Sequence, residues 1–249
     1  MKKIAIIFGS IKPYDSSARL VVDSILATFP KRDKYTYDIF ISGFEKPDDD
    51  RIIWTEDTIK NGELPALNAL TQTALEAGYD YFVIFSDDYK IAEGSVVDAV
   101  EFISGPAFAN KKYKICTLAT TTEGPCQFEG YLPFPEGSPN GIGIVCNVSH
   151  SIICRFPVLD RQTLIGFKGN IFHPDLLSGY ADSYLGYYLN LNGEPCVEFS
   201  SVKLQFMDHI HQFDAVSRKT EKWIKNRSET CETSSKLIIN LKAGEPYSK

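Results

Sequence analysis

Residues 77–88 read AGYDYFVIFSDD, and this stretch decides the fold class. Gly78 is placed to stop a preceding helix, because glycine tolerates the left-handed backbone found at helix ends. Residues 81–85 are a continuous apolar run of strand length, which is typical of a strand buried on both faces of a parallel sheet. The run ends abruptly at Ser86-Asp87-Asp88. Ligands of open α/β sheets bind beyond the carboxyl ends of the strands, so these polar residues are candidate site residues.

Predicted strands and helices alternate on both sides of this stretch. Apolar, aromatic or β-branched runs predict further strands at 3–8, 35–42, 112–119, 144–148 and 197–206. Apolar residues at helical spacing predict helices at 18–29, 65–75, 95–103 and 176–190. Ser16 or Ser17 can cap the first of these helices. The alternation predicts an α/β fold, with a mostly parallel central sheet flanked by helices in a single domain.

Composition narrows the class of protein. The chain has 249 residues, 43% of them hydrophobic, which is enough for a substantial core. It contains no run of about 18 apolar residues, so we expect no transmembrane segment. The six cysteines form no CxxC pair and follow no signal peptide, which favours a reduced, cytoplasmic protein with most cysteines in its core.

The net charge of −6 is unevenly distributed along the chain. Residues 218–249 hold eight Lys or Arg and four Glu, a net charge of +4, which leaves −10 for residues 1–217. We therefore predict a domain at 1–217 and a basic C-terminal extension at 218–249 that packs on it or trails from it. The extension could contact a membrane surface or an anionic partner, but a solvated helix face explains the same charges.

Two adjacent carboxylates, Asp87 and Asp88, are the first candidate for chemistry. They repel each other unless a cation lies between them and another anion. Mg²⁺ or Mn²⁺ bridging to a diphosphate suits such a pair, because hard cations take oxygen ligands and substrate phosphates. A solvated acidic turn is the competing interpretation.

Three further positions could contribute to a site. Asp182 lies on the polar side of an otherwise apolar helix and could act as a general base, or could stabilise the start of that helix. His209 and His211 alternate after a predicted strand, so they point the same way and could bind a metal ion. Phe8-Gly9-Ser10 follows the first strand and could contact a nucleotide, although it lacks G-x-G-x-x-G.

The order of these motifs resembles that of glycosyltransferases with the GT-A fold, in particular the large inverting, family 2-like group. Residues 68–88 resemble that group's helix "N-x-G-x-x-x-A" followed by "G-D-Y-hydrophobic-D-D". Arg155, Leu164-Ile165-Gly166-Phe167 and residues 180–186 resemble its "R…G-G-F-D-E…E-D-x-D-L" segment. The resemblance covers roughly residues 1–225.

The resemblance implies roles for individual residues. Asp88 would coordinate a divalent metal, Mn²⁺ or Mg²⁺, with His211 or His209 completing the site. Asp87 would contact the nucleotide sugar, and Ser86 stands at the motif's opening position. Asp182 falls on the family's catalytic base, which takes a proton from the acceptor hydroxyl as the sugar is transferred with inversion.

The loop Phe8-Gly9-Ser10 would line the nucleotide pocket. Relatives carry "D-x-x-S-x-D" after the second strand, where an Asp reads the base, whereas this chain has Ser42-Gly43-Phe44-Glu45. The implied partners are a nucleoside-diphosphate sugar donor and a glycan, lipid-linked or other hydroxyl-bearing acceptor. The acidic body argues against a nucleic acid acceptor, because DNA binders gain affinity from Lys and Arg.

Residues 120–143, with five glycines and four prolines, predict a long loop, either a lid over the donor or acceptor or a plain surface loop. Alternative functions are a sugar-nucleotidyltransferase of related fold and a catalytically inactive module that binds a sugar or nucleotide. A third alternative function is a flavin or nicotinamide reductase, which the "F-G-S" after the first strand would suit.

Overall fold

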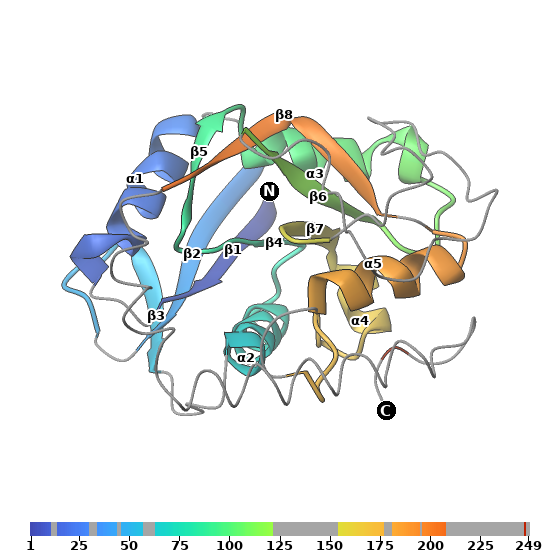
Figure 1. Ribbon diagram of the computed structural model, residues 1–249, viewed down its shortest axis with the longest axis horizontal. Helices are drawn as coiled ribbons and strands as arrows, with labels where there is room; N and C mark the ends of the chain where they lie inside the picture. The colour runs from blue at the N-terminus through green and yellow to red at the C-terminus, as the bar shows by residue number, and fades with distance from the viewer. Residues whose placement is uncertain are drawn as a thin grey trace.

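A computed structural model shows one curved sheet with helices on both faces (Figure 1). It describes residues 1–10, 14–29, 34–43, 46–56, 63–121, 154–176, 181–194, 196–207 and 247. The strands are β1 (Lys2–Gly9), β2 (Tyr35–Gly43), β3 (Ile52–Glu56), β4 (Tyr81–Ile84), β5 (Tyr89–Glu93), β6 (Ile115–Thr120), β7 (Pro157–Asp160) and β8 (Val197–Phe206). The helices are α1 (Ala18–Thr28), α2 (Glu63–Glu76), α3 (Val96–Ser104), α4 (Arg161–Gly166) and α5 (Ala181–Leu191), with 3₁₀ turns η1 (Tyr14–Ser16) and η2 (Pro106–Phe108).

The eight described strands form a sheet in the order β3-β2-β1-β4-β7-β6-β8-β5. Strands β1, β2, β3 and β4 are parallel, and so are β6 and β8. Strand β7 runs antiparallel to both β4 and β6, and β5 runs antiparallel to β8. It follows that six of these strands point the same way and only β5 and β7 are reversed. The predicted α/β domain with a mostly parallel sheet is confirmed.

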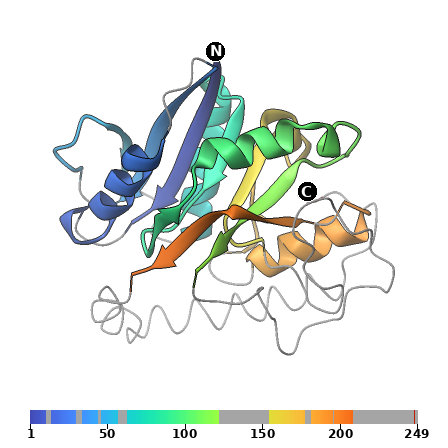
Figure 2. The ribbon, with the colours of Figure 1, turned by 90° about the horizontal axis from the view of Figure 1, so that it is seen from above.

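Alternate residues of each central strand enter two separate cores. In β1, Ile4, Ile6 and Phe8 pack with α1 and α3, whereas Ala5 and Ile7 pack with α2, α4 and α5. Figures 1 and 2 show these two groups of helices on opposite sides of the sheet. Burial on both faces explains why the central strands read as unbroken apolar runs.

Most predicted elements are present, and the deviations have local causes. Gly78 ends α2 with a φ of 83°, and Ser95 caps α3 by accepting a hydrogen bond from the Val97 N–H. Strands β3, β5 and β7 and helix α4, each four to six residues long, were not predicted. Helix α5 begins at Ala181 rather than at 176, since Leu176 belongs to a turn in which its N–H bonds to the His173 carbonyl.

Several predictions lie on residues outside the described part of the chain. They are the strand at 144–148, most of the loop at 120–143, His209, His211 and all of the extension at 218–249 except Tyr247. Within the described part, Cys116, Cys154 and Cys196 are buried free thiols, as expected. None of the described helices is both long and apolar enough to cross a membrane.

Asn68 joins α2 to the chain that follows α4. Its side-chain amide donates to the Phe172 carbonyl at 2.8 Å, and its amide oxygen accepts from the Phe172 N–H at 3.0 Å. Asn68 is 6% exposed, so both backbone groups would lose their partners away from water if the side chain were shortened. A buried polar group without a partner costs about 1–3 kcal/mol.

We therefore predict that Asn68→Ala lowers the free energy of unfolding by about 2 kcal/mol. The matched control is Asn170→Ala, because Asn170 also contacts α2, through Gln72, but at the surface. The control should change stability by less than about 0.5 kcal/mol. Urea denaturation of the three proteins measures both values, and equal losses would contradict the role given to Asn68.

Candidate functional site

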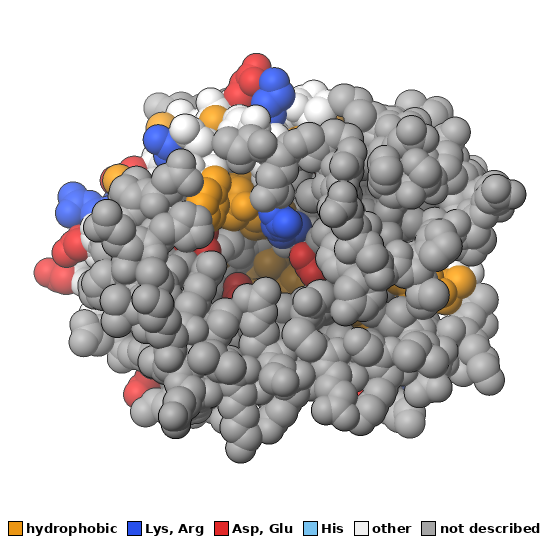
Figure 3. Space-filling model, in the orientation of Figure 1, with side chains coloured by type: hydrophobic (Ala, Val, Ile, Leu, Met, Phe, Trp, Pro, Cys, Tyr) orange, Lys and Arg blue, Asp and Glu red, His pale blue; other side chains and the backbone are white. Residues whose placement is uncertain are grey.

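The carboxyl ends of six strands and the amino ends of β5 and β7 meet at one edge of the sheet. Seen from Figure 1's viewpoint, the surface is hollowed near its centre, over β4 and β7, and acidic, basic and apolar side chains meet in the hollow (Figure 3). Of the predicted residues 8–10, Phe8 and Gly9 are the last two of β1, with the Phe8 side chain in the core, and Ser10 follows the strand; residues 86–88 lie between β4 and β5. The shared strand direction thus brings together candidates that are almost 80 residues apart in sequence.

Asp87 is buried and bound to the segment after β1. Its carboxylate accepts a 2.7 Å hydrogen bond from the Ser10 hydroxyl and a 3.4 Å one from the Ser17 hydroxyl. The Ser10 N–H in turn donates to the Ser42 carbonyl at the end of β2. Ser17 occupies the position before α1 but its side chain makes no capping hydrogen bond, so the predicted cap is wrong: the hydroxyl faces the buried carboxylate instead.

Asp88 is half-buried and lies between β4 and β5 in the chain, beside the residue that follows β8. Its N–H donates to the Ser86 hydroxyl at 3.3 Å, and its carbonyl accepts from the Met207 N–H at 2.9 Å. Met207 is the last described residue before 247, so His209 and His211 follow in sequence from a residue hydrogen-bonded to Asp88. Among the described residues, no group of three or more His, Cys, Asp or Glu side chains could hold a metal ion.

Asp182 lies in the first turn of α5, next to the segment that leads into β7. Its backbone carbonyl accepts a 3.1 Å hydrogen bond from the Cys154 N–H, just ahead of β7. Its carboxylate accepts from the Ser183 N–H at 2.8 Å. Burial raises the pKa of the Asp182 carboxyl above its usual value, while the Ser183 N–H and the Arg155 charge oppose this shift. The result is a half-buried carboxylate that is more basic than an ordinary Asp.

Arg155 connects the Asp182 region to the turn after Asp88. Its guanidinium donates to the Tyr89 hydroxyl at 3.3 Å, and its charge favours the ionised form of Asp182. The sequence motifs placed Arg155 near the site but gave it no role, because its partners come from β5 and α5, far away in the chain. The positive charge of Arg155 at this place suits a site that binds anionic groups.

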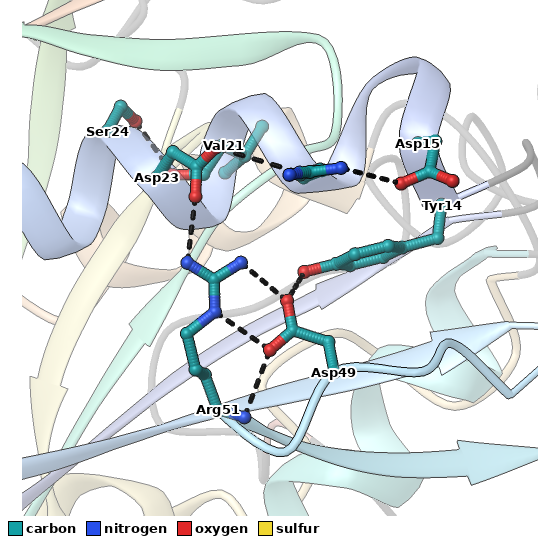
Figure 4. A network of polar contacts seen from close by, with 8 residues as sticks. Tyr14, Asp15, Val21, Asp23, Ser24, Asp49 and Arg51 are labelled. Atoms are coloured by element: carbon teal, nitrogen blue, oxygen red, sulfur yellow. Dashed lines mark hydrogen bonds and ion pairs between the residues drawn. The ribbon is translucent and has the colours of Figure 1, made fainter.

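A polar network fixes the segment after β1 to the link between β2 and β3 (Figure 4). The Arg51 guanidinium donates to both Asp49 carboxylate oxygens, at 2.8 and 2.5 Å, and to Asp23 of α1 at 2.8 Å. The Tyr14 hydroxyl also donates to Asp49. Tyr14, Asp49 and Arg51 line a cavity of about 470 Å³. Arg51, with Tyr14 contributing, lowers the pKa of Asp49 well below its usual value.

The comparisons with known proteins support the fold. The crystal structure of TarS residues 1–349 from S. aureus aligns with a TM-score of 0.53 and 12% identity, over 96% of this chain and 72% of that one. The same fragment solved with UDP and with UDP-GlcNAc gives TM-scores of 0.52. No protein-family model matches the chain, and no curated protein matches its sequence. At 12% identity, the likeness is one of fold.

The Asp49 network generates a pH prediction. Because the folded pKa of Asp49 is depressed, its ionised form stabilises the fold above the ordinary value of 3.8, and this contribution is lost as the pH falls through the folded pKa. The difference in free energy of unfolding between wild type and Asp49→Asn should therefore be constant from pH 7 to about pH 5 and shrink towards pH 2. Urea denaturation across this range measures it.

The exposed neighbour Asp48 provides the control. Asp48→Asn should leave the free energy of unfolding nearly unchanged at every pH. A wild-type advantage over Asp49→Asn that stays constant down to pH 2 would show that the carboxylate charge does not stabilise this network.

Proposed function

We propose that this protein is a glycosyltransferase that moves a sugar from a nucleoside-diphosphate sugar to an acceptor hydroxyl, with inversion at the anomeric carbon. The observation that carries the proposal is the position of Arg155, whose guanidinium donates to the hydroxyl of Tyr89, the residue after Asp88, and whose charge acts on the Asp182 carboxyl. TarS, which shares the fold, is a glycosyltransferase, and its structures include complexes with UDP and UDP-GlcNAc.

The donor nucleotide would lie against the end of β1, at Phe8-Gly9-Ser10. In this proposal Asp87 shapes the pocket, since its carboxylate binds the Ser10 and Ser17 hydroxyls and so holds this segment against β4. This differs from the role that the sequence resemblance implied, in which Asp87 contacts the nucleotide sugar itself. The acceptor could be a glycan, a lipid-linked sugar or another hydroxyl compound.

A divalent cation, Mn²⁺ or Mg²⁺, would be held by Asp88 together with His209 or His211. The carboxylate oxygens of Asp88 are suitable ligands, and the two histidines would supply what the described residues lack. Both histidines follow Met207 in the sequence, and the Met207 N–H donates to the Asp88 carbonyl. A cation bound there supplies charge stabilisation for the leaving diphosphate.

Asp182 would act as the general base. Its carboxylate takes the proton from the acceptor hydroxyl while that oxygen bonds to the anomeric carbon and the bond from that carbon to the diphosphate oxygen breaks. Burial raises the pKa of the Asp182 carboxyl and so makes it a stronger base, while the Arg155 charge favours its ionised form. The two effects together suit a base that must be deprotonated before the reaction and accept a proton during it.

The competing function is a catalytically inactive module that binds a sugar or nucleotide. The observation in its favour is that the Asp87 carboxylate is bonded to the Ser10 and Ser17 hydroxyls, a role in the fold that needs neither a metal nor a reaction. Binding without turnover would identify such a module, so the experiments below separate ligand binding from catalysis.

The first experiment tests catalysis. We predict that Asp182→Asn lowers kcat for sugar transfer, or for hydrolysis of the nucleotide sugar, by about 10²- to 10⁴-fold while the donor Kd stays within about twofold. In the wild type, the acid limb of the kcat/KM profile should have an apparent pKa above 3.8. Asp175→Asn is the control, because its side chain is 66% exposed, and it should retain full activity. Unchanged turnover in Asp182→Asn would exclude this base.

The second experiment tests the metal-dependent donor site. Thermal-shift assays with UDP, GDP and their sugars, at about 100 times Kd, should raise the melting temperature by roughly 5–10 °C when Mn²⁺ is present and much less without it. Asp88→Ala should abolish the Mn²⁺-dependent part of the shift while folding normally. Glu76→Ala, which removes an exposed carboxylate at the end of α2, should keep it. Failure of every nucleotide to shift the wild type would exclude the donor site.

A further inference from the structure

Tyr247 is buried among aromatic side chains although it lies 40 residues beyond β8's neighbour Met207. It is 2% exposed, and its hydroxyl donates a 3.0 Å hydrogen bond to the Ile171 carbonyl. Its ring centroid lies 4.6 Å from that of Phe167 and 4.9 Å from that of Tyr188. Tyr247 therefore fills a space between the turn after α4 and the helix α5.

The contacts of Tyr247 converge on one side of α5. Tyr184 and Tyr188 are one helical turn apart, and both rings contact Tyr247, at 5.7 and 4.9 Å between centroids. Asp182 precedes Tyr184 by two residues, which places it about 200° around the helix from that ring. Its carbonyl accepts a hydrogen bond from the Cys154 N–H. Helix α5 is thus held both by Tyr247 and by the segment before β7.

We propose that Tyr247 is a positioning residue, which fixes α5 and thereby holds Asp182 in place at the strand edge. The catalytic part of this inference rests on the proposed function, whereas the anchoring of α5 does not. The ring supplies the packing, and the hydroxyl satisfies the Ile171 carbonyl. Residue 247 then belongs to the folded core, and part of the predicted extension at 218–249 serves the domain that contains the site.

The side chains around the Tyr247 ring could fill its space only in part if the ring were removed. Phe167, Tyr184, Tyr188 and His173 all contact Tyr247 and also belong to the packing of α4 and α5. Removal of the Tyr247 ring leaves a cavity against α5, and neighbouring side chains relax into such cavities only partly. A displacement of about 1 Å in a catalytic group can reduce turnover by about 100-fold.

Hydrogen–deuterium exchange of the full chain tests the anchoring directly. In Tyr247→Ala, we expect amides of α5 to exchange at least about tenfold faster, while those of β1 keep their rates. Tyr247→Phe keeps the ring and should exchange like the wild type. If Tyr247→Ala does not fold, Tyr247→Leu, which fills part of the space, should show the same local effect. Wild-type exchange in α5 of a folded Ala or Leu variant would overturn the proposal.

Kinetics test the positioning of Asp182. Tyr247→Ala should lower kcat by at least about tenfold with the donor KM within about twofold, and Tyr247→Phe should restore kcat. Phe108→Ala is the control, since it removes a buried ring from the core on the other face of the sheet. It should lower the melting temperature without changing kcat or α5 exchange. Equal losses of kcat in Tyr247→Ala and Phe108→Ala would show that Tyr247 contributes only to general stability, and would overturn its positioning role.

The two proposals fail in distinguishable ways. Wild-type protein that neither transfers nor hydrolyses a nucleotide sugar would exclude the proposed function. The exchange measurements would still decide whether Tyr247 anchors α5, because they need no substrate.

Discussion

The common direction of six strands is the constraint on which the other features depend. Parallel neighbours place all their carboxyl ends at one edge, so segments separated by long stretches of chain meet there. The buried hydrogen bond between Ser10 and Asp87 shows the consequence at atomic scale, because it joins the ends of β1 and β4 across 77 residues of sequence. The reversed strands β5 and β7 start from the same edge, and they add Tyr89 and Arg155 to it.

The adjacent carboxylates Asp87 and Asp88 have different environments, although the sequence presents them as an equivalent pair. The Asp87 side chain is buried against two serine hydroxyls, whereas Asp88 is half-buried and contacts β8 through its carbonyl. Because of this difference, replacing Asp87 and replacing Asp88 would have different consequences. Replacing Asp87 would first disturb the turn after β1, while replacing Asp88 would first change the charge at the edge.

Sequence patterns predicted the strands and helices whose own residues form a clear apolar run or stripe. Strands β1, β2, β4 and β8 and helices α1, α2 and α3 carry clear apolar runs or stripes, and they are present close to the expected bounds. Strand β5 is only five residues long and is stabilised by pairing with β8, more than 100 residues later, so no local pattern could reveal it. The roles of Ser17 and Arg155 could not be predicted either, because their hydrogen-bond partners are distant in sequence.

The position of Tyr247 also bears on how the protein folds as it is synthesised. The core that contains α2, α4 and α5 includes this ring, which emerges from the ribosome after every described strand and helix. The described residues of the core on the other face, around α1 and α3, have all been made once Met207 is added. The described parts of the two cores would therefore be finished at different times, and the face that supports α5 would remain open to chaperones and proteases during translation until Tyr247 is added.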